Sequence, residues 1–174
     1  GTSITSPTGA AFNVAGSTAA VTYSGSITQA NNAALVNILN HSGGTITFQT
    51  GTLVASNGTG LQFNNADGIY NFNGTSTLNG GDAGIDIVNG SVGTFGFGAS
   101  TAITHTAAGD AFVLTDSNAD VTYSGSINDS NGYAIRIDNH DAGAITFQTG
   151  NIGANGAGAL GLSVINSNGG AKIN

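Results

Sequence analysis

The sequence predicts an all-β fold, specifically a right-handed parallel β-helix (β-solenoid) of about seven coils, each of 24–26 residues with three short strands. Three observations predict it. Apolar residues recur about every 25 residues, they alternate with polar residues within each short stretch, and clusters of Gly, Asn and Asp separate the stretches. Together these patterns indicate coils that stack on one another in register.

A long internal repeat runs through the chain. The sequence VTYSGSI of residues 21–27 recurs unchanged at 121–127, and ITFQTG of 46–51 recurs at 145–150, which sets a period of 99–100 residues. Residues 1–174 are therefore expected to form a single solenoid segment with about 1.75 copies of a four-coil unit. No capping segment is evident, so we expect the solenoid to continue covalently or to stack end to end with copies of itself.

Three ranks of apolar residues recur once per coil and are expected to form ladders in the core. The aromatic rank comprises Tyr23, Phe48, Phe72, Phe97, Tyr123 and Phe147. The aliphatic rank comprises Ile27, Leu53, Leu78, Ile103, Ile127 and Ile152. A third rank comprises Phe12, Leu61, Ile85, Phe112, Ile135 and Leu162, and skips the coil that contains Leu35. Stacked at the strand spacing of roughly 4.8 Å, each inward side chain would lie on its equivalents above and below.

Each rank belongs to a short strand with one buried face. Apolar residues alternate with polar ones, as in Val21 and Tyr23 or Leu61 and Phe63, which is the period of two of a strand. Clusters such as residues 64–68 and 139–143 supply corners, because Asn, Asp and Gly tolerate positive φ. An antiparallel sandwich or barrel also has short strands and frequent turns. It does not explain why equivalent residue types return every 24–26 positions.

Composition argues against several classes of partner. Charged residues make up 6% of the chain, the net charge is -7, and Arg136 and Lys172 are the two basic residues. We expect no nucleic-acid partner, because that requires a basic face. No apolar run approaches the roughly 20 residues of a membrane-spanning helix, so we expect no membrane insertion in this segment. Two basic residues also leave trypsin few cleavage sites, which favours an extracellular or cell-surface location.

The Gly-, Asn- and Thr-rich phrases at residues 4–9, 21–27, 46–51 and 84–88 resemble the β-strand repeats of very large bacterial surface proteins. That group includes autotransporter passengers and haemagglutinin-like adhesins, and the resemblance covers essentially the whole chain. It implies export, display as a fibre or stalk, and no enzymatic activity in the repeats. It transfers no functional residues, because the group has no defined catalytic motif.

No catalytic residue, metal site or cofactor is expected. Most Asp residues fall in corners, where they serve turn geometry, and the chain has no Glu to accompany them. Residues 80–86 resemble a calcium-binding turn, which makes Asp82 and Asp86 weak calcium candidates, but the match is one residue too long and occurs once. His41 and His140 are equivalent in the long repeat and are expected to be corner residues, whereas His105 has no partner in sequence.

Two function classes follow from these observations. The favoured one is a structural repeat of an extracellular or cell-surface fibre, stalk or adhesin whose partner is itself. The alternative is an adhesin module that binds a glycan or a surface, with a polysaccharide-acting β-helix enzyme less favoured still. A binding module should carry outward aromatic or charged clusters, and the aromatic residues expected to point outward are Tyr133 and Tyr70.

Overall fold

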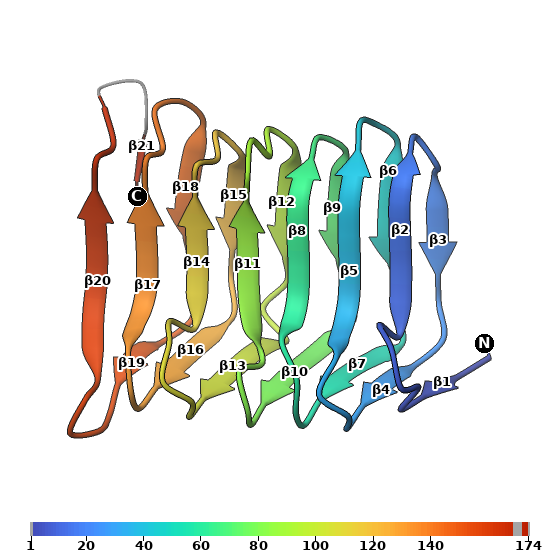
Figure 1. Cartoon of the computed structure of the whole chain (residues 1–174), viewed down its shortest axis with the longest axis horizontal. Coiled ribbons are helices and arrows are strands. Elements are labelled where there is room, and N and C mark those ends of the chain that lie inside the picture. Colours follow the sequence, from blue (N-terminus) through green and yellow to red (C-terminus); the bar gives the residue numbers. More distant parts are fainter. Residues whose placement is uncertain (1, 169–171, 174) are drawn as a thin grey trace.

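The computed structural model describes residues 2–168 and 172–173, which form β-strands and no helix. Strands follow one another in threes, and each strand of a triplet belongs to a different seven-stranded sheet. Figure 1 shows the resulting rod, in which we name the lower sheet A, the front sheet B and the rear sheet C. The front strands point up and the rear strands point down while the chain advances from right to left, so the coil is right-handed. The predicted parallel β-helix with three strands per coil is confirmed.

The strand bounds, given by sheet, are as follows. Sheet A contains β1 (Ile4–Thr5), β4 (Ile27–Gln29), β7 (Thr52–Ala55), β10 (Thr75–Asn79), β13 (Thr101–His105), β16 (Ser126–Asp129) and β19 (Ile152–Ala154). Sheet B contains β2 (Phe12–Ser17), β5 (Ala34–His41), β8 (Gly60–Ala66), β11 (Gly84–Val88), β14 (Phe112–Thr115), β17 (Tyr133–Asp138) and β20 (Leu160–Ile165). Sheet C contains β3 (Val21–Tyr23), β6 (Thr45–Phe48), β9 (Ile69–Phe72), β12 (Thr94–Phe97), β15 (Asp120–Tyr123), β18 (Ala144–Phe147) and β21 (Lys172–Ile173).

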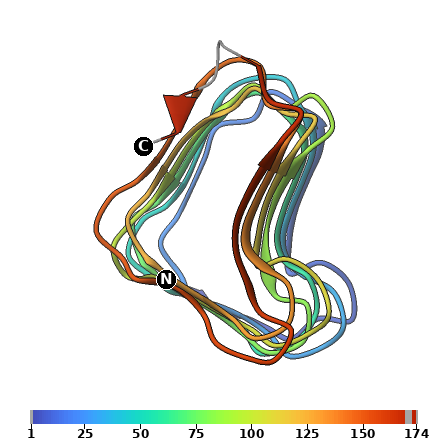
Figure 2. The ribbon, with the colours of Figure 1, turned by 90° about the vertical axis from the view of Figure 1, so that its left-hand side faces the viewer.

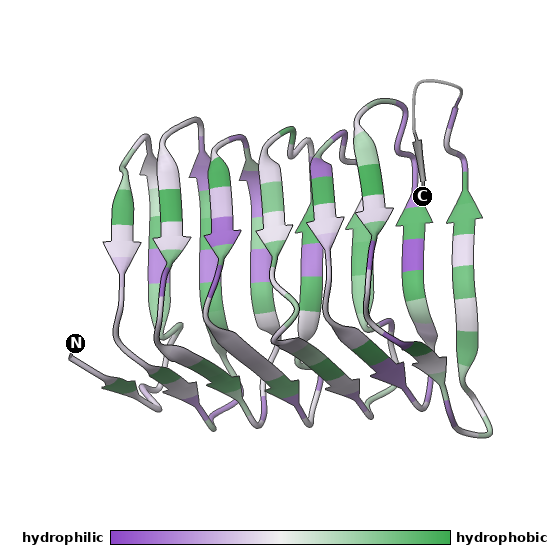
Figure 3. Ribbon diagram, turned by 180° about the vertical axis from the view of Figure 1, so that it is seen from behind, coloured by the Kyte–Doolittle hydropathy of each residue, from purple (hydrophilic) through white to green (hydrophobic). Residues whose placement is uncertain are grey.

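Viewed along the rod, the coils overlie one another and outline a three-sided cross-section (Figure 2). The side formed by sheet B, whose last strand β20 is dark red, curves inward. We name the three connections of each coil the A–B, B–C and C–A corners. Apolar and polar bands alternate along the strands in Figure 3, because successive side chains point into the core and out to solvent.

The aromatic rank forms one continuous column on the inner face of sheet C. Its six members are register partners from coil to coil: Tyr23, Phe48, Phe72, Phe97, Tyr123 and Phe147. The rings of Phe48, Phe72 and Phe97 stack, with centroids 4.9 and 5.0 Å apart and interplanar angles of 20°. Offset stacking of this kind adds to the burial of apolar area and holds the three central coils in register.

The inner face of sheet B carries the third rank without interruption. Val36 takes the place in the coil where the sequence pattern skipped a member, because a bulge between Ala34 and Val36 shifts the register by one residue. Leu35 is nevertheless fully buried.

The aliphatic rank of sheet A departs from the predicted single column. Leu53 pairs with Ser76, and Leu78 pairs with Ala55, so Leu53 and Leu78 are not register partners. At β10 the column is displaced along the strand by two residues, which is one inward position, because inward side chains recur every two residues. Leu53 and Leu78 therefore both remain buried. From Leu78 onward it continues through Ile103, Ile127 and Ile152. Ile152 is 43% exposed, since it lies in the last strand of the sheet.

The B–C corner repeats one backbone conformation in all seven coils. Each has a residue in the left-handed region, with φ between 49° and 58°: Gly16, Asn40, Asn65, Asn89, Asp116, Asn139 and Asn166. Asn and Asp adopt this conformation more readily than other non-glycine residues, because their short side chains bond locally. They also bond between coils, since the Asn65 side-chain amide donates to Asn40 Oδ1 at 3.0 Å. These residues therefore form the predicted corners through their left-handed backbone conformation, and Asn65 and Asn40 also join neighbouring coils.

The C–A corner depends on glycine for a different reason. Gly25, Gly51, Gly125 and Gly150 have no left-handed φ, yet a Cβ atom at any of them would overlap a backbone carbonyl oxygen of the preceding coil. For Gly125 that oxygen belongs to Thr101, and for Gly150 it belongs to Gly125. Close stacking of backbone on backbone at this corner therefore excludes any side chain.

Candidate functional site

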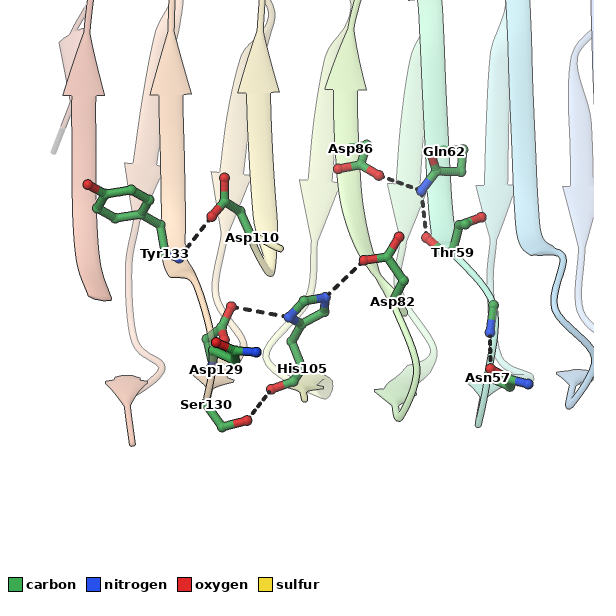
Figure 4. Close-up of polar contacts among 12 residues, drawn as sticks. Asn57, Thr59, Gln62, Asp82, Asp86, His105, Asp110, Asp129, Ser130 and Tyr133 are labelled. Atoms are coloured by element: carbon green, nitrogen blue, oxygen red, sulfur yellow. Dashed lines mark hydrogen bonds and ion pairs between the residues drawn. The ribbon is translucent and has the colours of Figure 1, made fainter. Parts of the chain in front are cut away.

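Charged side chains gather at one place, on the outer side of sheet B and the adjoining A–B corner, across three successive coils. We call this cluster the acidic corner, and it comprises Asp82, Asp86, His105, Asp110, Asp129 and Arg136. Figure 4 shows that its Asp and His members come from consecutive coils and lie along the line where the A–B corners meet sheet B. The chain has nine acidic and two basic residues in all, so four of the nine carboxylates and one of the two basic side chains gather here.

His105 lies between two carboxylates at the centre of the acidic corner. Its Nδ1 is 3.2 Å from Asp129 Oδ2 in the next coil, and its Nε2 is 3.3 Å from Asp82 Oδ1 in the preceding coil. The side chains of His105 and Asp129 are fully buried, whereas that of Asp82 is 60% exposed. The contact of Nε2 with Asp82 has hydrogen-bond geometry, whereas Nδ1 and Asp129 Oδ2 face each other without it. The group thus joins three coils through one hydrogen bond and one close polar contact.

The buried carboxylate of Asp129 has one further partner. Its Oδ1 accepts a hydrogen bond of 2.7 Å from the backbone N–H of Asn131 in the A–B corner. A buried carboxylate requires polar partners. Here Asn131 N–H bonds to Oδ1, while Oδ2 faces His105 Nδ1 without hydrogen-bond geometry. Because His105 has no exposed surface, it cannot reach a substrate in this conformation.

Asp86 projects outward from β11 beside this group. Gln62, its neighbour on β8, donates a hydrogen bond of 2.6 Å to Asp86 Oδ2. Burial raises the pKa of Asp86 to about 6, and the hydrogen bond from Gln62 offsets part of that rise. Asp82 and Asp110 raise the pKa further, since their negative charges disfavour a third nearby carboxylate.

Asp86→Asn is expected to stabilise the protein at neutral pH. Because the pKa of Asp86 is raised from 3.8 in the unfolded chain to about 6, its contribution to stability is greatest below pH 4 and falls as the pH rises to 6. The loss is on the order of 3 kcal/mol. Asparagine stays neutral and still accepts from Gln62, so unfolding by urea at pH 4 and pH 7 should show the variant gaining stability only at the higher pH. Asp120→Asn, at the exposed first residue of β15, whose carboxylate accepts from Ala144 N–H, is the control. Equal gains at both pH values would contradict the assignment.

Arg136 forms the outer edge of the acidic corner. Its guanidinium is 3.0 Å from Asp138 and 3.7 Å from Asp110, and its side chain remains 40% exposed. The hydrogen bond to Asp138 raises the pKa of Arg136, while hydrogen bonds from Asn166 and Arg136 lower the pKa of Asp138. Tyr133 begins the same strand, and its backbone N–H donates to Asp110 Oδ1 at 2.9 Å. Its half-buried ring points away from the carboxylates in Figure 4.

The two calcium candidates of the sequence do not converge on a common point. Asp82 pairs with His105, and Asp86 bonds to Gln62, so each carboxylate is directed to a protein partner. Among the described residues, no group of three or more His or Asp side chains is arranged to hold a metal ion. What the cluster offers chemically is therefore hydrogen-bonding and charged groups that face solvent, namely Asp82, Asp110 and Arg136.

His41 is buried at the end of β5 and links three coils by neutral hydrogen bonds. Its Nε2 lies 2.9 Å from the Ala19 carbonyl oxygen, which can only accept, so Nε2 carries the proton. Nδ1 then accepts from the Tyr70 hydroxyl at 2.8 Å, and that hydroxyl accepts from Gly68 N–H at 3.1 Å. Tyr70 is 1% exposed, so its predicted outward orientation is wrong. Burial also raises the pKa of Tyr70 to about 12.

Tyr70→Phe should lower the free energy of unfolding by about 1–3 kcal/mol, because it leaves His41 Nδ1 and Gly68 N–H buried without a partner. The ring itself and its stacking on Phe95 would be kept. Thermal unfolding measures the loss. The matched control is Tyr133→Phe, which removes a hydroxyl from a tyrosine outside the core. A similar cost in both variants would contradict the role given to the Tyr70 hydroxyl.

The structure shows one further hollow, on the outer face of sheet C. It measures about 170 Å³ and is lined by Asn73, Gly96, Phe97, Gly98 and Thr122. Gly96 stands where neighbouring coils carry Asn71 and Thr122, so a missing side chain accounts for the depression. It holds no charged group and lies on a different sheet from the acidic corner.

Comparison with protein-family models, with curated proteins and with solved structures finds no match for this chain. Within the described residues, no helix is long and apolar enough to cross a membrane.

Proposed function

We propose that this solenoid is a structural repeat of an extracellular or cell-surface fibre, stalk or adhesin, and that it extends through further coils or by stacking with copies of itself. The observation that carries the proposal is the uniformity of the coil. Each sheet keeps parallel pairing through seven strands, and each B–C corner keeps one left-handed residue. Repeats that stack in this way contact only their neighbours, so further coils of the same kind can be added at either end without altering the existing contacts.

The outer surface supports the same proposal. Outward positions on sheet C are short and uncharged, as in Thr22, Thr47 and Thr122, and Asn71 donates to Thr47 between coils. Such a surface presents little for a soluble partner to recognise by charge. It also offers trypsin few cleavage sites, because the chain has two basic residues.

Electron microscopy with two-dimensional averaging tests the proposal. Long unbranched filaments with an axial repeat of roughly 4.8 Å are the expected result, since that is the spacing of adjacent strands. Discrete short rods at high protein concentration would count against assembly of this chain into a fibre.

The second candidate is a module that binds a glycan through the acidic corner. The observation that favours it is the combination of the Tyr133 ring with exposed Arg136 and Asp82 on one side of the rod. A glycan array should then give a signal that Tyr133→Ala removes, while Gly161→Ala, where a Cβ meets nothing within 4 Å, leaves it unchanged. An array without any signal would remove this candidate.

A further inference from the structure

The A–B corner between β7 and β8 contains an unusual contact within one Asn-Gly pair. The backbone N–H of Gly58 donates to the side-chain oxygen Oδ1 of Asn57, the residue directly before it, at 2.8 Å. Asn57 is exposed, and Gly58 has a φ of 79° that other residues rarely adopt. The contact folds the Asn57 side chain, labelled in Figure 4, back toward its own following peptide and brings the side-chain carbonyl to the Gly58 nitrogen.

We infer that Asn57 is a site of spontaneous deamidation, a covalent modification that the fold itself promotes. The Gly58 nitrogen loses its proton to solvent and attacks Asn57 Cγ, so that an N–Cγ bond forms and a five-membered succinimide closes. The side-chain nitrogen takes up a proton and leaves as ammonia. Water then adds to one of the two ring carbonyls and opens the ring, giving aspartate or isoaspartate at position 57. Glycine favours closure because it has no side chain to obstruct the attacking nitrogen.

Other Asn-Gly pairs of the described chain are held in ways that oppose this reaction. In three pairs the glycine nitrogen donates to a carbonyl of a neighbouring coil: Gly74 to Phe48, Gly80 to Thr104 and Gly90 to Asp116. Such a nitrogen is held by a different coil and must leave it before it can approach its own Asn side chain, whereas the hydrogen bond of Gly58 already leads to the side chain of Asn57.

In the remaining two pairs the Asn side chain does not contact the following nitrogen. The Asn155 side-chain amide donates to Asn128 Oδ1 at 2.8 Å. Gly132 packs on the Gly109 carbonyl much as Gly58 packs on that of Ala33, but its nitrogen makes no hydrogen bond to the Asn131 side chain. Among the six pairs within residues 2–168, Asn57 is thus the one whose side chain already contacts its own glycine nitrogen.

Modification at this position would alter the stacking of three coils. A Cβ atom at Gly58 would overlap the Ala33 carbonyl of the preceding coil, and Gly81 of the next coil is packed against Asn57 Oδ1. Isoaspartate lengthens the backbone by one carbon where no room exists, and either product adds a negative charge beside the corner that carries Asp82. We therefore expect the reaction to loosen the solenoid at this corner as the protein ages.

The test is incubation of the purified chain in mildly alkaline buffer at raised temperature, with peptic fragments followed over time by tandem mass spectrometry and an isoaspartate assay. Conversion at Asn57 should be about fivefold faster than at Asn89, because the hydrogen bond from Gly90 to a neighbouring coil must break before the nitrogen approaches Asn89, whereas that of Gly58 joins it to the reacting side chain. Asn57→Gln should remove the first mass increase, because the longer side chain would have to close a six-membered ring.

Unfolding in urea provides the matched control. The six pairs share the same two residue types, so their rates should become similar once the fold no longer distinguishes them. Conversion of Asn73, Asn79 or Asn89 ahead of Asn57 in the folded protein would overturn the inference. An unchanged ranking in urea would also overturn it, because the preference would then come from local sequence and not from the corner.

Discussion

His105→Ser should lower the free energy of unfolding by about 3–5 kcal/mol, because it removes the imidazole that faces the fully buried carboxylate of Asp129. Asp129 would keep its hydrogen bond from Asn131 N–H, but that bond alone does not compensate for a charge taken out of water. Chemical unfolding at neutral pH, followed by circular dichroism, measures the loss.

The first copy of the long repeat shows which neutral residues can replace His105 and Asp129, and so provides a control. One long repeat earlier, Ser6 stands in the place of His105 and Gln29 in the place of Asp129. Gln29 accepts from Asn31 N–H at 3.0 Å, as Asp129 does from Asn131, and donates to the Gly9 carbonyl at 2.8 Å. A neutral amide therefore satisfies this corner in the first copy.

The double variant His105→Ser, Asp129→Gln should consequently be more stable than His105→Ser alone. It copies the neutral arrangement of the first repeat and leaves no unpaired charge in the core. A full double-mutant cycle isolates the coupling between the two residues. If the two single losses simply add in the double variant, the ion pair does not act as a unit and the interpretation of the acidic corner is wrong.

The fold could be predicted because the stacking of coils in a solenoid produces a regular period in the sequence. Each inward residue lies on its own equivalents, so the aromatic rank from Tyr23 to Phe147 is visible as a period and reappears as register partners. The left-handed corners are visible for a similar reason, since seven coils need one residue each that tolerates positive φ. At these positions the local conformational preference of the residue and the packing of the whole fold favour the same residue type.

The acidic corner could not be predicted from the repeat period, because His105 and Asp129 differ from the equivalent residues in the first copy of the long repeat. His105 and Asp129 are 24 residues apart and are register partners, but inspection of each residue alone shows no neighbour in sequence. The signal that could have revealed them is a paired change between the two copies of the long repeat, from Ser6 and Gln29 to His105 and Asp129. The sideways step at Leu53 and Ser76 was missed because a shift of two residues preserves the inward face and leaves the alternation intact.

Gly125→Ala should destabilise the protein by about 3 kcal/mol or more, although it adds one methyl group, because overpacking against backbone has no flexible neighbour to relieve it. The new Cβ would overlap the Thr101 carbonyl oxygen of the preceding coil. Relief requires the two coils to separate, and separation weakens the flanking strand pairs β13–β16 and β12–β15. The effect should therefore reach beyond the corner into sheets A and C.

Gly96→Ala distinguishes this steric explanation from a general intolerance of side chains at glycine. Gly96 lies in strand β12, and a Cβ there would approach nothing closer than 3.7 Å. Alanine should stabilise the protein by roughly 0.5–1 kcal/mol, since it reduces the conformational entropy of the unfolded chain. Urea unfolding of both variants decides the matter, with hydrogen exchange of sheets A and C reporting how far the disturbance spreads. Equal destabilisation by the two substitutions would show that close backbone stacking at the C–A corner is not what requires glycine, and the coils would then have to be held apart by another feature.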